Sequence, residues 1–355
     1  STAVGEFGYS AHKDPYNKAK WRHSGHVKFT YSGLYPVIET SFDFNDRGLR
    51  QYNVGTYTDG KTGFVELRSR EVNAPYFEGK IAAYIPFKFS GKGWYSGFIP
   101  RVSYTFTNDR FNKSLVMMGY GDMGTAGYPT FLGADKGRNI FRQYLTASVR
   151  GYTMLATPNS AVYPKWGACL EIGASTNLGL EKYISPTGYV YGYCYMPGVV
   201  PEQGLKLTAV YQQILSPKSF FGQAVVNVLP KGLQENVQLL SWVSTRTPSI
   251  VKMSADYAIP VYIGDLVLGI NVLAVKRLVV TPNFDCTIIG KRALWSAGAD
   301  LAFDLESILT IEFPITLGIT YSYNGGFNGS FNAFQNESGT EMKRHFLGPI
   351  FNVVF

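Results

Sequence analysis

Apolar and polar residues alternate along most of the chain from residue 26 onward. The clearest run covers residues 311–323, where Ile, Phe, Leu and Tyr occupy the odd positions and mostly Thr, Glu and Ser lie between them. Side chains that alternate with a period of two lie on opposite faces of a β-strand, one of which is then apolar. Similar runs begin at Val27, Ile38 and Trp295, so the pattern predicts an all-β protein.

The segments between these runs predict how the strands are joined. Residues 59–63 are typical of a hairpin tip, and residues 108–139 and 324–343 are long, polar loops rich in Gly and Asn. Long loops alternate with short turns when antiparallel hairpins close into a barrel, and counting hairpins predicts roughly 16 strands, within a range of about 14–18. Residues 1–25 show no periodicity and are predicted to be an N-terminal periplasmic tail or linker, which leaves 26–355 as the barrel.

The composition indicates that this barrel crosses a membrane. Only 16% of the 355 residues are charged, against about 25% in a typical soluble domain, and 15% are aromatic. The mean hydropathy is nevertheless −0.04, as expected when lipid-facing and lumen-facing residues alternate and their hydropathies cancel. No apolar run approaches the ~18 residues that a membrane helix needs. The predicted fold is therefore a transmembrane antiparallel β-barrel, a class of multi-pass protein that is typical of bacterial outer membranes.

The net charge of +8 is spread over the chain, one or two Lys or Arg per predicted strand. A nucleic-acid binder would cluster these residues, so we expect no nucleic-acid partner and instead anionic lipid headgroups, lipopolysaccharide among them.

Three cysteines without CxxC spacing indicate neither a zinc site nor a disulfide framework. His12, His23 and His26 lack ligand spacing, and no metal or other cofactor is expected. With no initiator Met and no signal peptide, we interpret the chain as mature or as a fragment of a longer one.

Tyr189, Tyr191, Tyr193 and Tyr195 share one face of a predicted strand. They could form a platform for a sugar, but a lipid-facing strand with its ends in the interfacial aromatic girdle is the favoured interpretation. On that interpretation Cys169 and Cys194 both point inward.

Charged residues on the predicted inward faces carry both signs. They could line an aqueous channel, or pair into a plug. These residues are Glu39, Arg101, Arg142, Arg150, Glu171, Lys252, Asp256, Asp300 and Glu312.

The last predicted strand ends the chain on an aromatic residue. It resembles the C-terminal signal by which bacterial outer-membrane barrels are recognised and inserted. The aromatic, glycine and apolar positions of that signal are matched by Phe346, Gly348, Phe351, Val353 and the terminal Phe355. The resemblance implies that this strand closes the barrel. A buried terminal strand of a soluble sandwich is the alternative.

The final 125 or so residues resemble the BamA/TamA superfamily of outer-membrane assembly and secretion barrels. Leu229-Pro230-Lys231-Gly232-Leu233 lies where that family has an Arg-Gly-aromatic motif on a loop that folds into the lumen, although Lys replaces Arg and Leu233 replaces the aromatic residue. The resemblance implies that Lys231 and Gly232 enter the lumen. There the Lys231 ammonium is predicted to meet Asp256 or Asp285.

A closer overall likeness is to the C-terminal barrel of large bacterial proteins that carry a TolB-like propeller ahead of it. Residues 163–167, 195–198 and 204–207 have counterparts in that group.

Such a barrel has three candidate functions, as a scaffold, a pore or an enzyme. A BamA-like barrel would be an assembly, translocation or scaffold component of an outer-membrane complex, with periplasmic or outer-membrane protein partners. The alternative is a passive pore for small solutes. A barrel lipase or protease would need Ser and His on adjacent strands near the rim. The one histidine in a predicted strand is His345, with no serine placed beside it, so no enzyme is expected.

Overall fold

The computed structural model describes most of the chain. The described residues are 2–13, 21–33, 35–45, 51–54, 67–70, 76–107, 142–157, 161–179, 185–216, 225–234, 236–268, 273–308, 315–338 and 341–353. The predicted hairpin tip at 59–63 and the predicted loop at 108–139 lie outside this part of the chain.

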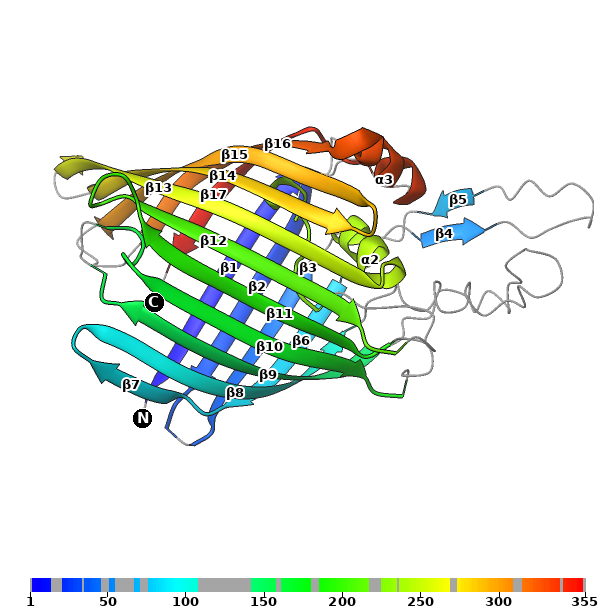
Figure 1. The fold of residues 1–355 in the computed structure, drawn as a ribbon, viewed down its shortest axis with the longest axis horizontal. Coiled ribbons are helices and arrows are strands. Elements are labelled where there is room, and N and C mark those ends of the chain that lie inside the picture. The colour runs from blue at the N-terminus through cyan, green and yellow to red at the C-terminus, as the bar shows by residue number, and fades with distance from the viewer. Residues whose placement is uncertain are drawn as a thin grey trace, which may run out of the picture.

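One antiparallel sheet of fifteen strands makes up the body of the protein (Figure 1). Its strands are β1 (Ala3–Lys13), β2 (Trp21–Tyr31), β3 (Val37–Asn45), β6 (Tyr76–Tyr84), β7 (Phe87–Gly91), β8 (Trp94–Thr107), β9 (Arg142–Leu155), β10 (Gly167–Asn177), β11 (Thr187–Pro197), β12 (Gly204–Ile214), β13 (Ser249–Leu268), β14 (Leu273–Ile289), β15 (Arg292–Ile308), β16 (Ile315–Gly326) and β17 (His345–Val353). The short strands β4 (Gln51–Val54) and β5 (Leu67–Arg70) pair only with each other.

The sheet curls into a barrel. Neighbours in sequence are neighbours in the sheet, and its two end strands, β1 and β17, come into contact without forming a ladder in the described residues (Figure 1). β7 continues the line of β6 along β8, with Tyr84 opposite Arg101 and Phe87 opposite Phe98. The fifteen strands therefore fill fourteen positions around the barrel. The predicted all-β, antiparallel barrel is confirmed, at the lower end of the predicted range of strand number.

The N-terminal residues are part of this sheet, contrary to the predicted tail at 1–25. β1 pairs along its whole length with β2, from Ala3 opposite Tyr31 to Lys13 opposite Trp21. The alternation is weak here because two of the outward positions of β1 are Ala3 and Gly5, which leaves Phe7 and Tyr9 as the apolar signal. β1 and β2 also place His12, His23 and His26 in strands, whereas the sequence pattern predicts only His345 in a strand.

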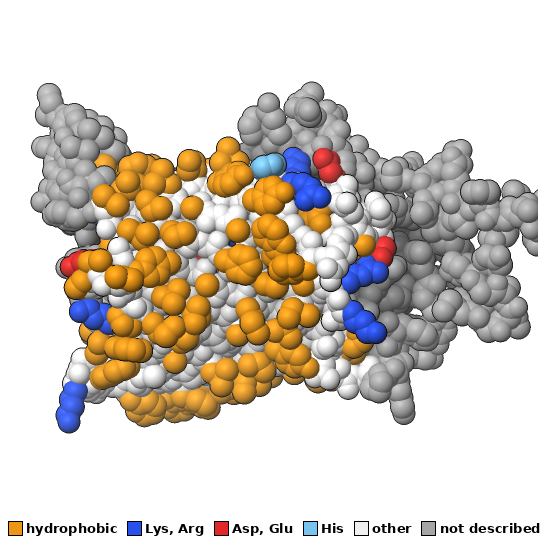
Figure 2. Space-filling view, turned by 45° about the horizontal axis from the view of Figure 1, so that its top comes forward, with side chains coloured by type: hydrophobic (Ala, Val, Ile, Leu, Met, Phe, Trp, Pro, Cys, Tyr) orange, Lys and Arg blue, Asp and Glu red, His pale blue; other side chains and the backbone are white. Residues whose placement is uncertain are grey.

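The outer surface of the barrel is apolar, as the alternation predicts. Figure 2 shows hydrophobic side chains over most of the visible wall, with Lys, Arg, Asp and Glu confined to its two ends. Outward residues such as Ile172 and Leu347 are 54% and 71% exposed. Their neighbours in sequence point inward, and many of those are polar and buried, such as Ser296 and Thr287.

The two ends of the barrel differ. Short connections and both chain termini lie at one end, which we call the short-turn end; the helices lie at the other, the long-loop end (Figure 1). The helices are η1 (Lys231–Leu233), α2 (Val237–Arg246), η2 (Phe327–Gly329) and α3 (Ser330–Ser338). Asn236 begins α2 as its N-cap, because its side chain accepts a hydrogen bond from the Leu239 N–H at 2.9 Å. No helix in the described part of the chain is long and apolar enough to cross a membrane.

A hydrophobic core lies inside the long-loop end. Leu229, Leu239 and Leu294, from three different segments, are fully buried there. α3 adds Phe331 and Phe334, so residues 324–343, predicted as an outer loop, include a packed helix. The other buried members of this core are Val210, Val228, Leu233, Val243, Ile250, Ile289 and Met342.

Candidate functional site

Residues 225–234, which we call the lumen segment, dock against the inner wall of the barrel. η1 contacts β15, β16 and β17. Strand side chains satisfy the backbone of the segment: the Lys252 ammonium donates to the Leu229 carbonyl at 2.7 Å, and the Thr287 hydroxyl donates to the Val228 carbonyl at 2.6 Å. Since buried backbone groups must be paired, the inward polar residues of β13 and β14 hold this segment in place.

Gly232 lies where the segment comes closest to the wall. Its carbonyl accepts a hydrogen bond from the Asn324 amide at 3.2 Å, and its N–H points at the Ser296 hydroxyl, 3.5 Å away. A Cβ at this position would overlap Asn324 Oδ1 and lie 2.8 Å from Ser322 Cβ. Only glycine allows the backbone to approach β16 this closely.

Lys231 extends its ammonium to the carboxylate of Asp300 on β15. The predicted partners were Asp256 and Asp285, so the direction into the lumen was anticipated but the partner is different. Asp285 instead accepts a hydrogen bond from the backbone N–H of Lys231 at 3.3 Å. The difference arises because the Lys231 side chain reaches β15, while its backbone N–H meets Asp285 on β14.

Asp285 connects the lumen segment to three strands. It accepts hydrogen bonds from the Ser254 hydroxyl on β13 and, at 3.3 Å, from the Ser296 hydroxyl on β15. The Lys252 ammonium lies 3.8 Å away, and both side chains are 6% exposed. A buried charge is tolerated only when it is paired and hydrogen-bonded, and Asp285 meets both conditions.

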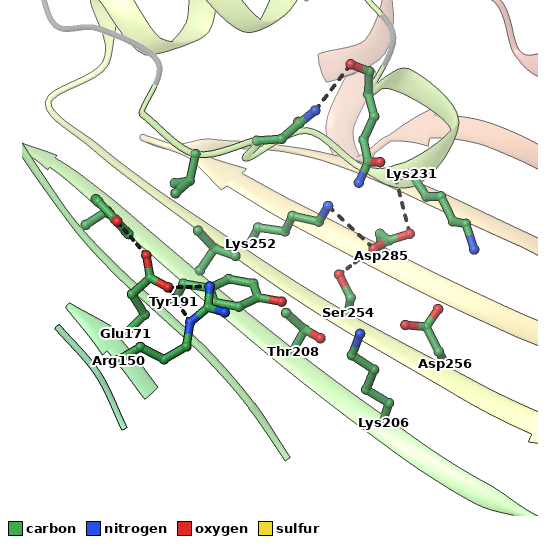
Figure 3. Close-up of a pocket in the computed structure, with 15 residues that line it drawn as sticks. Arg150, Glu171, Tyr191, Lys206, Thr208, Lys231, Lys252, Ser254, Asp256 and Asp285 are labelled. Carbon is green, nitrogen blue, oxygen red and sulfur yellow. Dashed lines mark hydrogen bonds and ion pairs between the residues drawn. The ribbon is translucent and has the colours of Figure 1, made fainter. Parts of the chain in front are cut away.

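Beneath the lumen segment lies a cavity of about 450 Å³. Tyr191, Thr208, Lys206 and Asp256 line its floor and sides, from β11, β12 and β13 (Figure 3). Lys206 and Asp256 face each other across the β12–β13 ladder. Among the described residues Asp256 has no hydrogen-bonding partner, so the structure does not join it to Lys231. The lining residues are Arg150, Glu171, Tyr189, Tyr191, Lys206, Thr208, Val210, Val226, Asn227, Lys231, Gln234, Lys252, Ser254, Asp256 and Asp285.

Inward charges on the remaining strands form pairs. Arg101 binds Glu39, and Arg150 binds Glu171 with 2.6 Å between Nε and Oε2. These pairs join adjacent or nearby strands across the interior. Further pairs are Lys28 with Glu6 and Glu39, and Arg277 with Asp304, and the His26 ring is hydrogen-bonded to Asp43. The side chains of Arg142 and Glu312 lie outside the described part of the chain.

The tyrosines of β11 face the lumen, and their predicted lipid-facing orientation is wrong. Tyr191 and Tyr193 are the cross-strand partners of Glu171 and Cys169, which face inward, whereas Leu170 between them is 50% exposed on the outer wall. Tyr189 is 6% exposed, and its hydroxyl donates to Glu171 Oε1 at 2.6 Å.

Cys194 pairs with Ala168 and faces outward, so only Cys169 of the two cysteines lies inside. The other face of β11 carries Gly188, Val190, Gly192 and Cys194, small residues that lipid accepts. Both orientations therefore fitted the alternation.

Tyr163, in the connection between β9 and β10, adds a further ring to this side of the lumen. Its ring centroid lies 5.3 Å from that of Tyr195. Burial raises the pKa of its hydroxyl, so Tyr163 stays neutral and able to donate a hydrogen bond.

The proposed insertion signal is described only in part. Phe346 and Gly348 face inward on β17, with the Phe346 ring 3.0 Å from where a Gly348 Cβ would lie. The side chains of Phe351 and Val353, and Phe355 as a whole, lie outside the described residues. Within the described residues, no group of three or more His, Cys, Asp and Glu side chains could hold a metal ion.

No known family model matches the chain. No curated protein matches it either. Among solved structures, the chain is similar to BamA from Haemophilus ducreyi lacking POTRA domains 1–3, with a TM-score of 0.46 and 10% sequence identity, over 99% of this chain and 69% of that one. This likeness concerns the fold alone.

Proposed function

We propose that this protein is an integral barrel of a bacterial outer membrane. The observation that carries the proposal is the apolar outer wall. Soluble monomers expose single apolar side chains, or patches of a few hundred Å². Here apolar residues face outward on strands all around the barrel, while hydrogen-bonded polar residues face the lumen. Along the sheet each inner strand is hydrogen-bonded on both sides, which satisfies the backbone groups that lipid cannot. The short-turn end would then face the periplasm.

The lumen segment supports a scaffold rather than an open channel. It is hydrogen-bonded to β13, β14 and β16 and covered by the core that α2 and α3 complete. Together with the sequence resemblance to assembly and secretion barrels, this supports a role as an assembly, translocation or scaffold component of an outer-membrane complex. Its partners would be periplasmic or outer-membrane proteins and membrane lipids, including lipopolysaccharide. The proposal includes no catalytic role.

A passive pore for small solutes is the second candidate. The charged cavity beneath the lumen segment favours it, because ions and polar solutes are stabilised by paired charges of both signs.

Conductance of the purified protein in a planar bilayer separates the two functions. We expect silence or brief, small openings from the intact protein. Gly232→Ala, which pushes the lumen segment off the wall, should produce larger and longer openings. Gly151→Ala is the matched control, because a Cβ at Gly151 meets nothing within 4 Å. Steady open currents from the intact protein would contradict the scaffold and support the pore.

Membrane insertion has its own test. The protein should fold into lipid vesicles and float with them in a density gradient, and its boiled and unboiled forms should migrate differently on a gel. A preparation that stays soluble and folded without detergent would overturn the outer-membrane proposal.

A further inference from the structure

Aromatic rings form a continuous wall inside the barrel. The ring centroids of Tyr191 and Tyr193 lie 5.8 Å apart, and those of Tyr193 and Tyr195 lie 5.3 Å apart. Tyr163 extends the row beyond Tyr195. We call these four residues the tyrosine wall. From Tyr191 to Tyr195 the strand advances about 13 Å, and Tyr163 lengthens the surface further.

The tyrosine wall is accessible along most of its length. Tyr191 packs against the hydrophobic core and the lumen segment, which ends the wall at the long-loop side. Tyr193 and Tyr195 continue toward the short-turn end and are only partly buried. Tyr189 differs, since it is buried, lies over Gly173 and is tied to Glu171, as expected for a tyrosine with a purely structural role.

Polar groups stand beside the wall. The Lys206 ammonium lies 5.3 Å from the centroid of the Tyr193 ring, and Thr208 and Asp256 lie next to it in the cavity (Figure 3). These three side chains point into the same space, and no hydrogen bond or ion pair joins them to one another in Figure 3. They supply a cation, a hydroxyl and a carboxylate, and so can both donate and accept hydrogen bonds.

The charges around the cavity balance. Arg150 pairs with Glu171, Lys231 with Asp300 and Lys252 with Asp285. That leaves Lys206 and Asp256, one charge of each sign. An anionic ligand would be repelled by Asp256 and a cationic one by Lys206, so the site favours a neutral ligand with many hydroxyl groups.

We propose that the tyrosine wall and the adjoining cavity bind a neutral saccharide chain. The C–H faces of sugar rings are apolar and stack on the faces of tyrosine rings, while the hydroxyls reach Lys206, Thr208 and Asp256. The ligand enters from the short-turn end, because the lumen segment and the core cover the other end. This inference goes beyond the role in assembly and requires only that the barrel is folded.

The test is calorimetric titration of the detergent-solubilised protein with three oligosaccharides. Maltohexaose represents a neutral glucan, chitohexaose represents a neutral N-acetylglucosamine chain, and an oligogalacturonate of the same length represents an anionic one. We expect at least one neutral chain to bind and the anionic chain not to bind. The neutral chain that binds then identifies the class of saccharide, a glucan or an N-acetylglucosamine chain. Absence of binding by both neutral chains would overturn the proposal, as would binding of the anionic chain alone.

Variants locate the site. Tyr195→Ala should weaken binding about tenfold, the size expected for loss of one aromatic contact. Tyr195→Phe should keep most of the affinity, because the ring remains. Asp256→Asn preserves the shape of the side chain and should also weaken binding about tenfold, by removing a charged acceptor.

Tyr211→Ala is the matched control for these variants. It removes the same residue type from the neighbouring strand β12, but from the outer face, since Tyr211 pairs with outward Val190. Heat-modifiable migration on a gel confirms that each variant is folded. Should Tyr195→Ala fail to fold, Asp256→Asn and Tyr195→Phe still decide the question. Unchanged affinity in Asp256→Asn, or equal losses in Tyr211→Ala, would place binding elsewhere and overturn the proposal.

Discussion

Replacing Asp285 by Ala removes the group that ties the lumen segment to the barrel wall. The residue is 4% exposed and receives hydrogen bonds from Ser254, Ser296 and the Lys231 N–H. Its loss leaves the Lys252 ammonium, 5% exposed, with the Leu229 carbonyl as its remaining partner at 2.7 Å. Removing one member of a buried ion pair costs about 3–5 kcal/mol, because the other charge stays desolvated.

The assay is the temperature at which the unboiled protein loses its folded migration on a gel. For a chain of this size, a loss of about 3–5 kcal/mol lowers that midpoint by on the order of 4–7 °C. Glu337→Ala is the control: its pair with Arg292 is 43% exposed on both sides, so its removal should cost about 0–1 kcal/mol. The double variant Lys252→Met with Asp285→Ala should lose less than the sum of the single variants, since no charge is left unpaired. An Asp285→Ala midpoint as high as that of Glu337→Ala would refute this reasoning.

Three further outcomes are expected. Gly232→Ala should lower the heat stability by about 2–4 kcal/mol, because its Cβ meets the β16 wall, whereas Gly151→Ala should leave the gel midpoint within about 0.5 kcal/mol of the parent. A membrane-soluble maleimide should label Cys194 from the lipid, and a membrane-impermeant one should not; labelling of Cys169 by the lipid-soluble reagent alone would reverse the assigned orientation of β10 and β11. Deleting Phe355 should reduce the amount inserted into membranes in cells more than it lowers the melting midpoint of the barrel that does insert, and normal membrane levels would speak against an insertion signal.

Alternation predicted the barrel because lipid on one side and water on the other impose opposite demands on neighbouring residues. The alternation gives a wrong prediction where the outward residues are only weakly apolar, or where both faces of a strand suit lipid. The outward positions Ala3 and Gly5 of β1 carry little hydrophobic signal, so the sequence predicts a tail where the structure has a strand. On β11 both faces are acceptable to lipid, since tyrosine tolerates either environment. Only the register with Glu171 on β10 decides between them.

The lumen segment was predictable from the Pro230-Lys231-Gly232 resemblance, but its contacts were not. Which carboxylate meets Lys231 depends on how η1 rotates the side chain, and Asp285 and Asp300 are both inward residues within the same region. The helices α2 and α3 were also missed. Their apolar residues recur at helical spacing, as in Leu239 and Val243, which is a signal that could have found them.

The hydrophobic core at the long-loop end divides the barrel into parts of unequal cooperativity. Every member of that core lies between Val210 and Met342, and the described residues of β1 to β9 contribute none. A group of contacts confined to one stretch of chain opens and closes as a unit, so β12 to β16 with α2 and α3 should behave as a single foldon. Amide hydrogens there should exchange slowest, and those of the N-terminal strands should exchange first. The C-terminal half would serve as the rigid frame on which the other strands can open and reclose.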